Sequence, residues 1–137
     1  MALSLEDIEG YLQKLDRRYE KLDGTLLVSM GHGQSPVALL VVPPVAVLQV
    51  GITEAPKDGE AGERMASNAR LFRKLLELNA NDLVHAAYGL EGDRVVLAAA
   101  LDIDNLGLTE LEAVLADMDM ALANHVPVLR GMIEEKE

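Results

Sequence analysis

The sequence predicts an α+β fold in which an antiparallel five-stranded sheet carries three helices packed on one face. Two observations support this fold class. Apolar residues recur at helical spacing in three segments, and shorter apolar runs of strand length lie between them. Residues typical of turns, such as Gly, Pro, Asn and Asp, separate the segments. The predicted order is helix, three strands, helix, two strands and helix, in a single domain over residues 1–137.

The first helix is predicted over residues 5–22. Ser4 can cap it, and Asp7 follows near the free N–H groups of the first turn. The apolar residues of this segment fall on one stripe at 100° per residue and predict one buried face. They are Leu5, Ile8, Leu12, Leu15, Tyr19 and Leu22.

Three strands are predicted next, over residues 25–30, 37–42 and 45–52. A turn over residues 31–35 joins the first two. Pro43–Pro44 predicts a turn between the second and third, because proline cannot donate to a strand ladder.

The second half of the chain begins with a predicted loop over residues 55–63 and a helix over 63–78. A hairpin of strands 83–90 and 94–101 should follow, turning at residues 91–93. The run Val95–Leu101 has almost no polar alternation, which favours a strand covered on both faces.

The last helix is predicted to open at Thr109, which forms a capping box with Glu112. Pro127 lies inside this helix. It lacks an N–H group and crowds the carbonyl of Ala123, so a kink or break is expected at residues 124–127.

Charge and composition exclude several classes of function. The formal net charge is −11, so direct binding of nucleic acid is disfavoured, because that binding depends on Lys and Arg neutralising phosphates. The sequence contains no Cys, which excludes disulfides and thiolate chemistry. No signal peptide and no apolar run of transmembrane length is apparent, so we expect a cytoplasmic protein without membrane association.

Excess apolar surface predicts a homodimer. Leu71, Leu75 and Leu78 widen the apolar arc of the second helix beyond what one core needs, and both faces of the predicted sheet are apolar. We therefore expect these three residues at a dimer interface, with Arg70 and Lys74 forming salt bridges across it or to an acidic client. The alternative is a compact monomer with a deeply buried sheet.

The chain resembles the YbjN family of the type III secretion chaperone-like fold, a family often called bacterial sensory-transduction regulators. The resemblance lies in the element order and in four segments, which are Leu75–Asn79, His85–Leu90, Val95–Leu101 and Thr109–Leu111. It implies a homodimer without enzymatic activity that holds a partly extended client segment, through strand addition and pockets for alternate side chains. Nothing in the sequence points to a secretion system.

The expected client site lies on the outer strands, in the range 25–42. Its candidate residues are Leu26, Val28, Val37, Leu39 and Val41. The net charge favours a client with a basic surface, and that class includes proteins that handle nucleic acids. The alternative function is a small-ligand sensor that uses the same sheet as a pocket.

No segment predicts catalysis, a metal site or a cofactor. The three histidines, His32, His85 and His125, are far apart and lack zinc-ligand spacing. The segment Asp102–Gly107 resembles a calcium loop but lacks ligands at the fifth and twelfth positions. The Gly31–Gly33 segment is not followed by the Lys-Ser or Lys-Thr of a phosphate loop. A buried cluster of histidine, carboxylate and hydroxyl in a cleft would be needed to indicate an enzyme.

Overall fold

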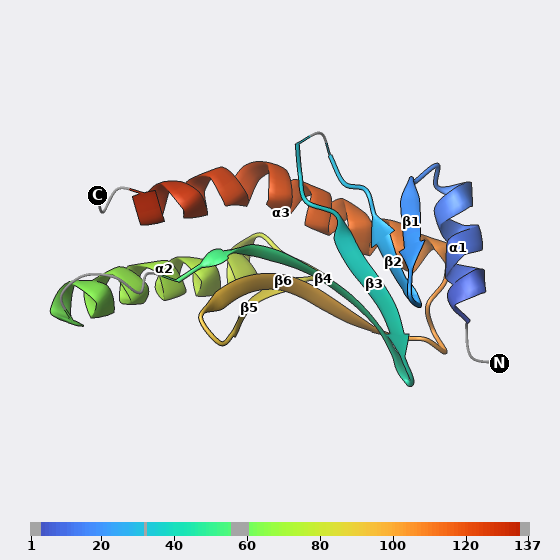
Figure 1. Ribbon diagram of the computed structural model, residues 1–137, viewed down its shortest axis with the longest axis horizontal. Helices are drawn as coiled ribbons and strands as arrows, with labels where there is room; N and C mark the ends of the chain where they lie inside the picture. Colours follow the sequence, from blue (N-terminus) through green and yellow to red (C-terminus); the bar gives the residue numbers. More distant parts are fainter. Residues whose placement is uncertain (1–3, 32, 56–60, 135–137) are drawn as a thin grey trace.

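The computed structural model describes residues 4–31, 33–55 and 61–134, which form one antiparallel sheet and three helices (Figure 1). The helices are α1 (Leu5–Lys14), α2 (Ala61–Asn81) and α3 (Leu108–Glu134). The strands are β1 (Tyr19–Leu22), β2 (Thr25–Val28), β3 (Val37–Val42), β4 (Val45–Glu54), β5 (Ala87–Glu91) and β6 (Arg94–Asp102). The sheet has the order β1-β2-β3-β4-β6-β5, with every neighbouring pair antiparallel.

The α+β class and the element order are confirmed, but the sheet has six strands rather than five. The additional strand comes from the predicted first helix. That helix begins as expected, with Ser4 and Asp7 forming a capping box, but it ends at Lys14. Asp16 then takes a left-handed conformation with φ of 60°, which an α-helix cannot continue through. The segment Tyr19–Leu22 pairs with β2 instead.

Most other boundaries lie within a few residues of the prediction. The Pro43–Pro44 turn joins β3 to β4 as expected. The expected strand over 83–90 begins only at Ala87, since residues 84–86 donate their N–H groups to the side chain of Asp117. Residues 56–60 of the expected loop lie outside the described residues.

The last helix differs from the prediction at its start and at its proline. It begins at Leu108, and the Glu110 carboxylate accepts a hydrogen bond from the Gly107 N–H at 2.9 Å, so the Thr109–Glu112 capping box is wrong. The helix continues through Pro127, so the expected break does not occur, while the expected kink stays a prediction. A proline costs one backbone hydrogen bond, and this helix buries enough apolar surface to tolerate that loss.

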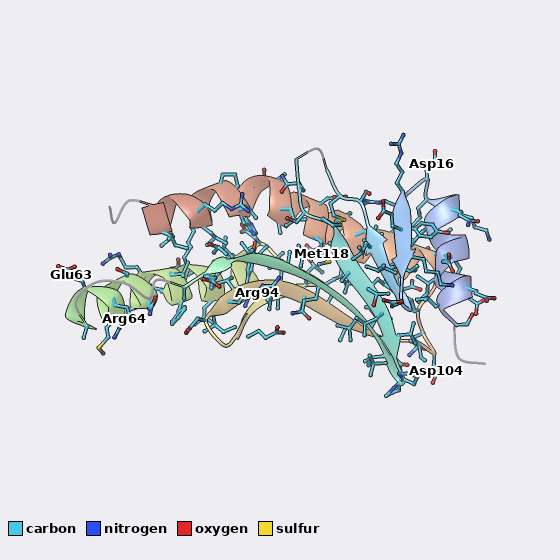
Figure 2. All side chains as sticks on the ribbon, viewed as in Figure 1. Asp16, Glu63, Arg64, Arg94, Asp104 and Met118 are labelled. Atoms are coloured by element: carbon cyan, nitrogen blue, oxygen red, sulfur yellow. The ribbon has the colours of Figure 1, made fainter. Side chains whose placement is uncertain are left out.

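The core lies between one face of the sheet and the helices. Alternate residues of β4, namely Ala46, Leu48, Val50 and Ile52, are buried, while their neighbours along the strand are partly exposed. The buried set continues through Leu26 and Leu39 and meets apolar residues of all three helices. Figure 2 shows Met118 of α3 in this layer, and its side chain has no exposed surface. α1 lies beside β1 at one end of the molecule, and α2 lies at the other (Figure 1).

Candidate protein-binding surface

The face of the sheet opposite the helices carries an apolar patch, which we call the open-face patch. Its members alternate along β1–β4 with the buried residues of the core face, so they point away from the helices. They are Leu22, Leu27, Leu40, Val42, Val45 and Val47. Leu22 is 60% exposed and Val42 is 48% exposed, while the other four are partly buried by their neighbours in the sheet. Large aliphatic side chains gathered on an exposed face usually mark an interaction site.

The same face becomes polar toward β5. The Gln49 amide donates to the Glu91 carboxylate at 2.9 Å across β6. The Arg94 guanidinium lies over Gly51, where any side chain carbon would overlap it. The large aliphatic side chains of the open face therefore lie on β1–β4, small alanines follow on β6, and charged groups lie at the β5 end.

The structure places the predicted client-binding residues on the opposite face. Leu26, Val28, Val37 and Leu39 have no exposed surface, and Val41 packs partly buried against the same core. A client therefore cannot contact the first four in this conformation. These residues lie in the core because both faces of β3 are apolar in sequence, and only the position of the helices decides which face is covered.

Three of the predicted dimer residues of α2 are also buried in the core of this single chain. Leu71, Leu75 and Leu78 are 1%, 5% and 7% exposed within this single chain, so they need no partner to cover them. Arg70 is exposed and Lys74 is partly exposed. The premise that these leucines form an uncovered face is wrong. The apolar residues left on the outer side of α2 are Met65 and Leu76, at 70% and 68% exposed, with Phe72 partly buried between them.

Two polar side chains hold the segment that leads into β5. The Asp117 carboxylate of α3 accepts the N–H groups of Val84, His85 and Ala86 at 3.2, 2.8 and 2.9 Å. The Asn79 side chain accepts the Tyr88 N–H at 2.7 Å and donates to the Tyr88 carbonyl at 3.1 Å. The main chain entering β5 is thus fixed by side chains of both α2 and α3.

A hydroxyl–histidine–carboxylate chain lies next to this segment, and its hydroxyl and histidine are buried. The Tyr88 hydroxyl is 2.9 Å from His125 Nδ1, and His125 Nε2 is 3.0 Å from the Asp82 carboxylate. Burial raises the pKa of the Tyr88 phenol, and the nearby carboxylates of Asp82 and Asp117 add to the rise. Tyr88 and His125 are 7% and 4% exposed, and none of the hollows described below opens onto them. The cluster links the end of α2 to β5 and α3, and its exposed member is Asp82, whose side chain is 46% exposed.

The other candidate metal and ligand residues are scattered. His85 is exposed in the segment before β5, and His32 lies outside the described residues. Within residues 4–31, 33–55 and 61–134, no group of three or more His, Asp or Glu side chains is arranged to hold a metal ion. The segment Asp102–Gly107 is a turn, in which the Asp102 carboxylate accepts the Asp104 N–H at 2.9 Å.

Several hollows meet at the corner between α1 and β1. One of about 550 Å³ is lined by Arg17, Arg18, Tyr19, Glu20 and Ser29. A neighbouring one of about 330 Å³ shares Glu20 and Ser29 and extends to Leu27 and Gln34. Arg17 is paired with Asp119 of α3 at 2.5 Å. Asp16 marks this corner in Figure 2. These hollows adjoin the open-face patch through Leu27.

Comparisons with known proteins agree with this architecture. The model of the CesT_Tir_1 family, a type III secretion chaperone family, matches residues 1–135. The chain belongs to this family. Among solved structures, a chain of the heterodimeric ExoU–SpcU complex from the type III secretion system of Pseudomonas aeruginosa is similar in fold. It has a TM-score of 0.65 and 17% identity, over 88% of this chain and 95% of that one.

YbjN from E. coli is also similar in fold, with a TM-score of 0.59 and 13% identity, over 91% of this chain and 97% of that one. A search of curated proteins found no match. The family match and the two folds confirm the resemblance to secretion chaperones and to YbjN that the sequence indicated. In the described part of the chain, no helix is both long and apolar enough to span a membrane.

Proposed function

We propose that this chain is a non-enzymatic, homodimeric chaperone-like module that holds an extended segment of a client protein against the open face of its sheet. The family assignment supports a protein-binding role. The open-face patch carries the proposal, because it leaves six aliphatic side chains on a face that none of the described helices packs against. Covering such a side chain fully contributes about 1.5–3 kcal/mol relative to leaving it in water.

The charge of the chain favours a basic client. The formal net charge is −11, and acidic side chains such as Glu20 and Asp102 border the open-face patch on β1 and β6. A client with Lys or Arg flanking apolar residues would match both the patch and its border. This class includes proteins that handle nucleic acids, so a link to DNA or RNA would run through the client.

We assign the dimer contact to the outer side of α2 rather than to Leu71, Leu75 and Leu78. Met65 and Leu76 are the most exposed large apolar residues of this helix, and they lie on one strip with Phe72. Arg73 and Glu77 form an ion pair at 3.5 Å beside that strip. A two-fold axis would bring the strip, and charges of both signs, against their own copies.

Light scattering tests the dimer. The chain has a mass of 14.8 kDa, so we expect a particle of twice that mass for the native protein and of 14.8 kDa for Leu76→Glu. Val84→Glu is the matched control, because Val84 is 80% exposed but lies in the segment before β5, outside α2. A native particle of 14.8 kDa would refute the homodimer and leave client binding to be tested separately.

Client binding is tested with one unfolded reporter protein that carries either a polylysine or a polyglutamate tag. We expect the chain to suppress aggregation of the lysine-tagged reporter more strongly, and Val42→Glu to reduce that effect. Val84→Glu is the control, since Val84 is 80% exposed but lies in the segment before β5. Equal loss in both variants, or no suppression by the native chain, would contradict the proposed surface.

The structure gives less support to the small-ligand alternative. Small-molecule sites are usually enclosed and mostly apolar. The hollow at the α1–β1 corner is a surface feature lined by charged side chains such as Arg17, Arg18 and Glu20. That lining suits a flexible polar segment of a protein better than a compact ligand.

A further inference from the structure

Arg94 lies on the open face of the sheet without a charged partner. It begins β6, and Figure 2 shows it at the end of the sheet near α2. Its side chain points to the open face, because the next residues of alternating orientation, Val95 and Leu97, are buried in the core. Glu54 and Glu91 stand directly opposite Arg94 on the two neighbouring strands. Even so, no ion pair or hydrogen bond among the described residues involves the Arg94 guanidinium.

The contacts around Arg94 hold its side chain against the sheet and leave its N–H groups unused. The Glu91 carboxylate accepts a hydrogen bond from Gln49 at 2.9 Å. The guanidinium lies over Gly51, where a Cβ atom would overlap it. Val96 is directly opposite Gly51 and only 7% exposed, although none of the described helices packs on this face, so the Arg94 side chain helps to cover it. A guanidinium held in this way presents its N–H donors to an anion from outside the chain.

The surroundings of Arg94 favour a carboxylate over a phosphate. A guanidinium can bind either group through two parallel hydrogen bonds. A phosphate group carries about −1.5 to −2 charges at neutral pH, so Glu54 and Glu91 repel it more strongly than they repel a carboxylate. The open-face patch is also within reach, since Val47 lies four residues from Gly51 along β4, about 13 Å away at 3.3 Å per residue. An extended peptide can therefore place an acidic side chain at Arg94 and an apolar one on the patch.

We propose that Arg94 binds an acidic side chain of the client segment that covers the open-face patch. The client stays basic overall, because Asp102 lies on the same face at the other end of β6, eight residues from Arg94 and about 26 Å away. The basic residues of the client lie toward Asp102, its apolar residues lie on the patch, and one acidic residue lies at Arg94. This inference rests on the proposed function and adds a specificity-determining residue and the order of charges along the client.

The test uses two threonine-rich peptides of eleven residues. The matched peptide carries Glu, Leu and Lys at its third, seventh and ninth positions, a spacing that follows Gly51, Val47 and Val45 along β4. The neutral peptide carries Gln at the third position and is otherwise identical. We expect the matched peptide to bind about threefold to fivefold more tightly at low salt, which is the scale of an exposed ion pair. The ratio should fall toward one as salt screens the charges.

Binding is followed by the NMR shifts of the Arg94 Nε–H group and the Val47 amide, at peptide concentrations up to millimolar. In Arg94→Gln, where the Val47 amide alone reports binding, the preference for the matched peptide should disappear. In Arg94→Glu, a peptide with Lys at the third position should bind more tightly than the matched one. Arg130→Gln removes the same charge from an exposed position of α3 and should leave the preference unchanged. Inorganic phosphate at the same concentration should shift the Arg94 signal less than the matched peptide does.

Equal affinities for the two peptides, no binding by either peptide, or a preference that persists in Arg94→Gln would overturn the proposal. A larger shift with phosphate would overturn the choice of a carboxylate. These outcomes are distinct from failure of the proposed function. If Val42→Glu abolishes suppression of reporter aggregation while the two peptides bind equally, the open-face patch binds clients and Arg94 takes no part in selecting them.

Discussion

The two ends of the sheet are held in different ways. At the β5 end, Asn79, Asp117 and His125 hydrogen-bond to β5 or to the segment that precedes it. At the β1 end, the contacts are between side chains, such as Arg17 with Asp119 and Lys21 with Glu9, and no hydrogen bond from another described residue reaches the outward main-chain groups of β1. An edge strand therefore does not always offer free main-chain groups to a further strand, because one side chain, here Asn79, can hydrogen-bond to them.

The largest effect is expected from Asp117→Ala. This change leaves three main-chain N–H groups without their acceptor, and hydrogen bonds to a charged group contribute about 1.5–3 kcal/mol. We expect the free energy of unfolding to fall by about 2–3 kcal/mol, measured by urea denaturation.

Asp119→Ala is the matched comparison, two residues along the same helix. It removes a partly exposed ion pair with Arg17 at the β1 end, which is worth at most about 1 kcal/mol. If the two variants were equally unstable, the claim that the two ends are held differently would fail.

A smaller effect is expected from Asn79→Ala, which opens the β5 edge. Loss of two hydrogen bonds to Tyr88 should lower the free energy of unfolding by about 1–2 kcal/mol. In the native protein, amide hydrogen exchange should be slow at Tyr88 and fast at Tyr19 and Lys21. The Asn79→Ala substitution should raise the exchange rate of Tyr88 and leave the rates of the other two amides unchanged. Asn81→Ala, at an exposed position of α2, should change neither quantity.

The smallest effect concerns Tyr88 and appears at alkaline pH. The phenol pKa is raised in the folded state above its ordinary value of 10.0. The contribution of the neutral phenol to the free energy of unfolding is therefore fully present below pH 10.0, and it is lost as the pH rises toward the pKa of the folded state. Tyr88→Phe should cost about 1 kcal/mol at pH 8, through loss of the hydrogen bond to His125.

The stability difference between Tyr88→Phe and the native protein should therefore shrink between pH 10 and 11.5, as followed by urea midpoints. Tyr19→Phe provides the control at the β1 end and should run parallel to the native curve. A Tyr88→Phe curve that stays parallel as well would show that the buried phenol does not oppose ionisation.

The sequence predicted the element order because most of its signals are local. Ser4 caps the first helix with Asp7 in its first turn, as expected, and Pro43–Pro44 gives the expected turn. β1 was missed because Tyr19 and Leu22 fit a helical stripe with Leu15, and four residues are too few to show a strand period. The strand exists because it pairs with β2, and a left-handed residue at Asp16 allows that pairing.

The residues of the candidate surfaces could not be predicted from the sequence. On the outer strands and on α2, most of the apolar residues that the sequence singled out are buried in the core. Leu39 and Leu40 are adjacent and chemically identical, and one is buried while the other lies on the open face. The roles of Asn79 and Asp117 had no signal in the sequence, because each acts on main-chain groups of another element.

Composition, charge and apolar spacing by themselves determined the α+β class, the acidic character and the three helices, because these depend on short-range periods and residue counts. The tertiary structure decided which face of each strand and helix is covered, and which edge of the sheet is closed. Those properties depend on contacts between residues distant in sequence, such as Asn79 with Tyr88 and Asp117 with residues 84–86.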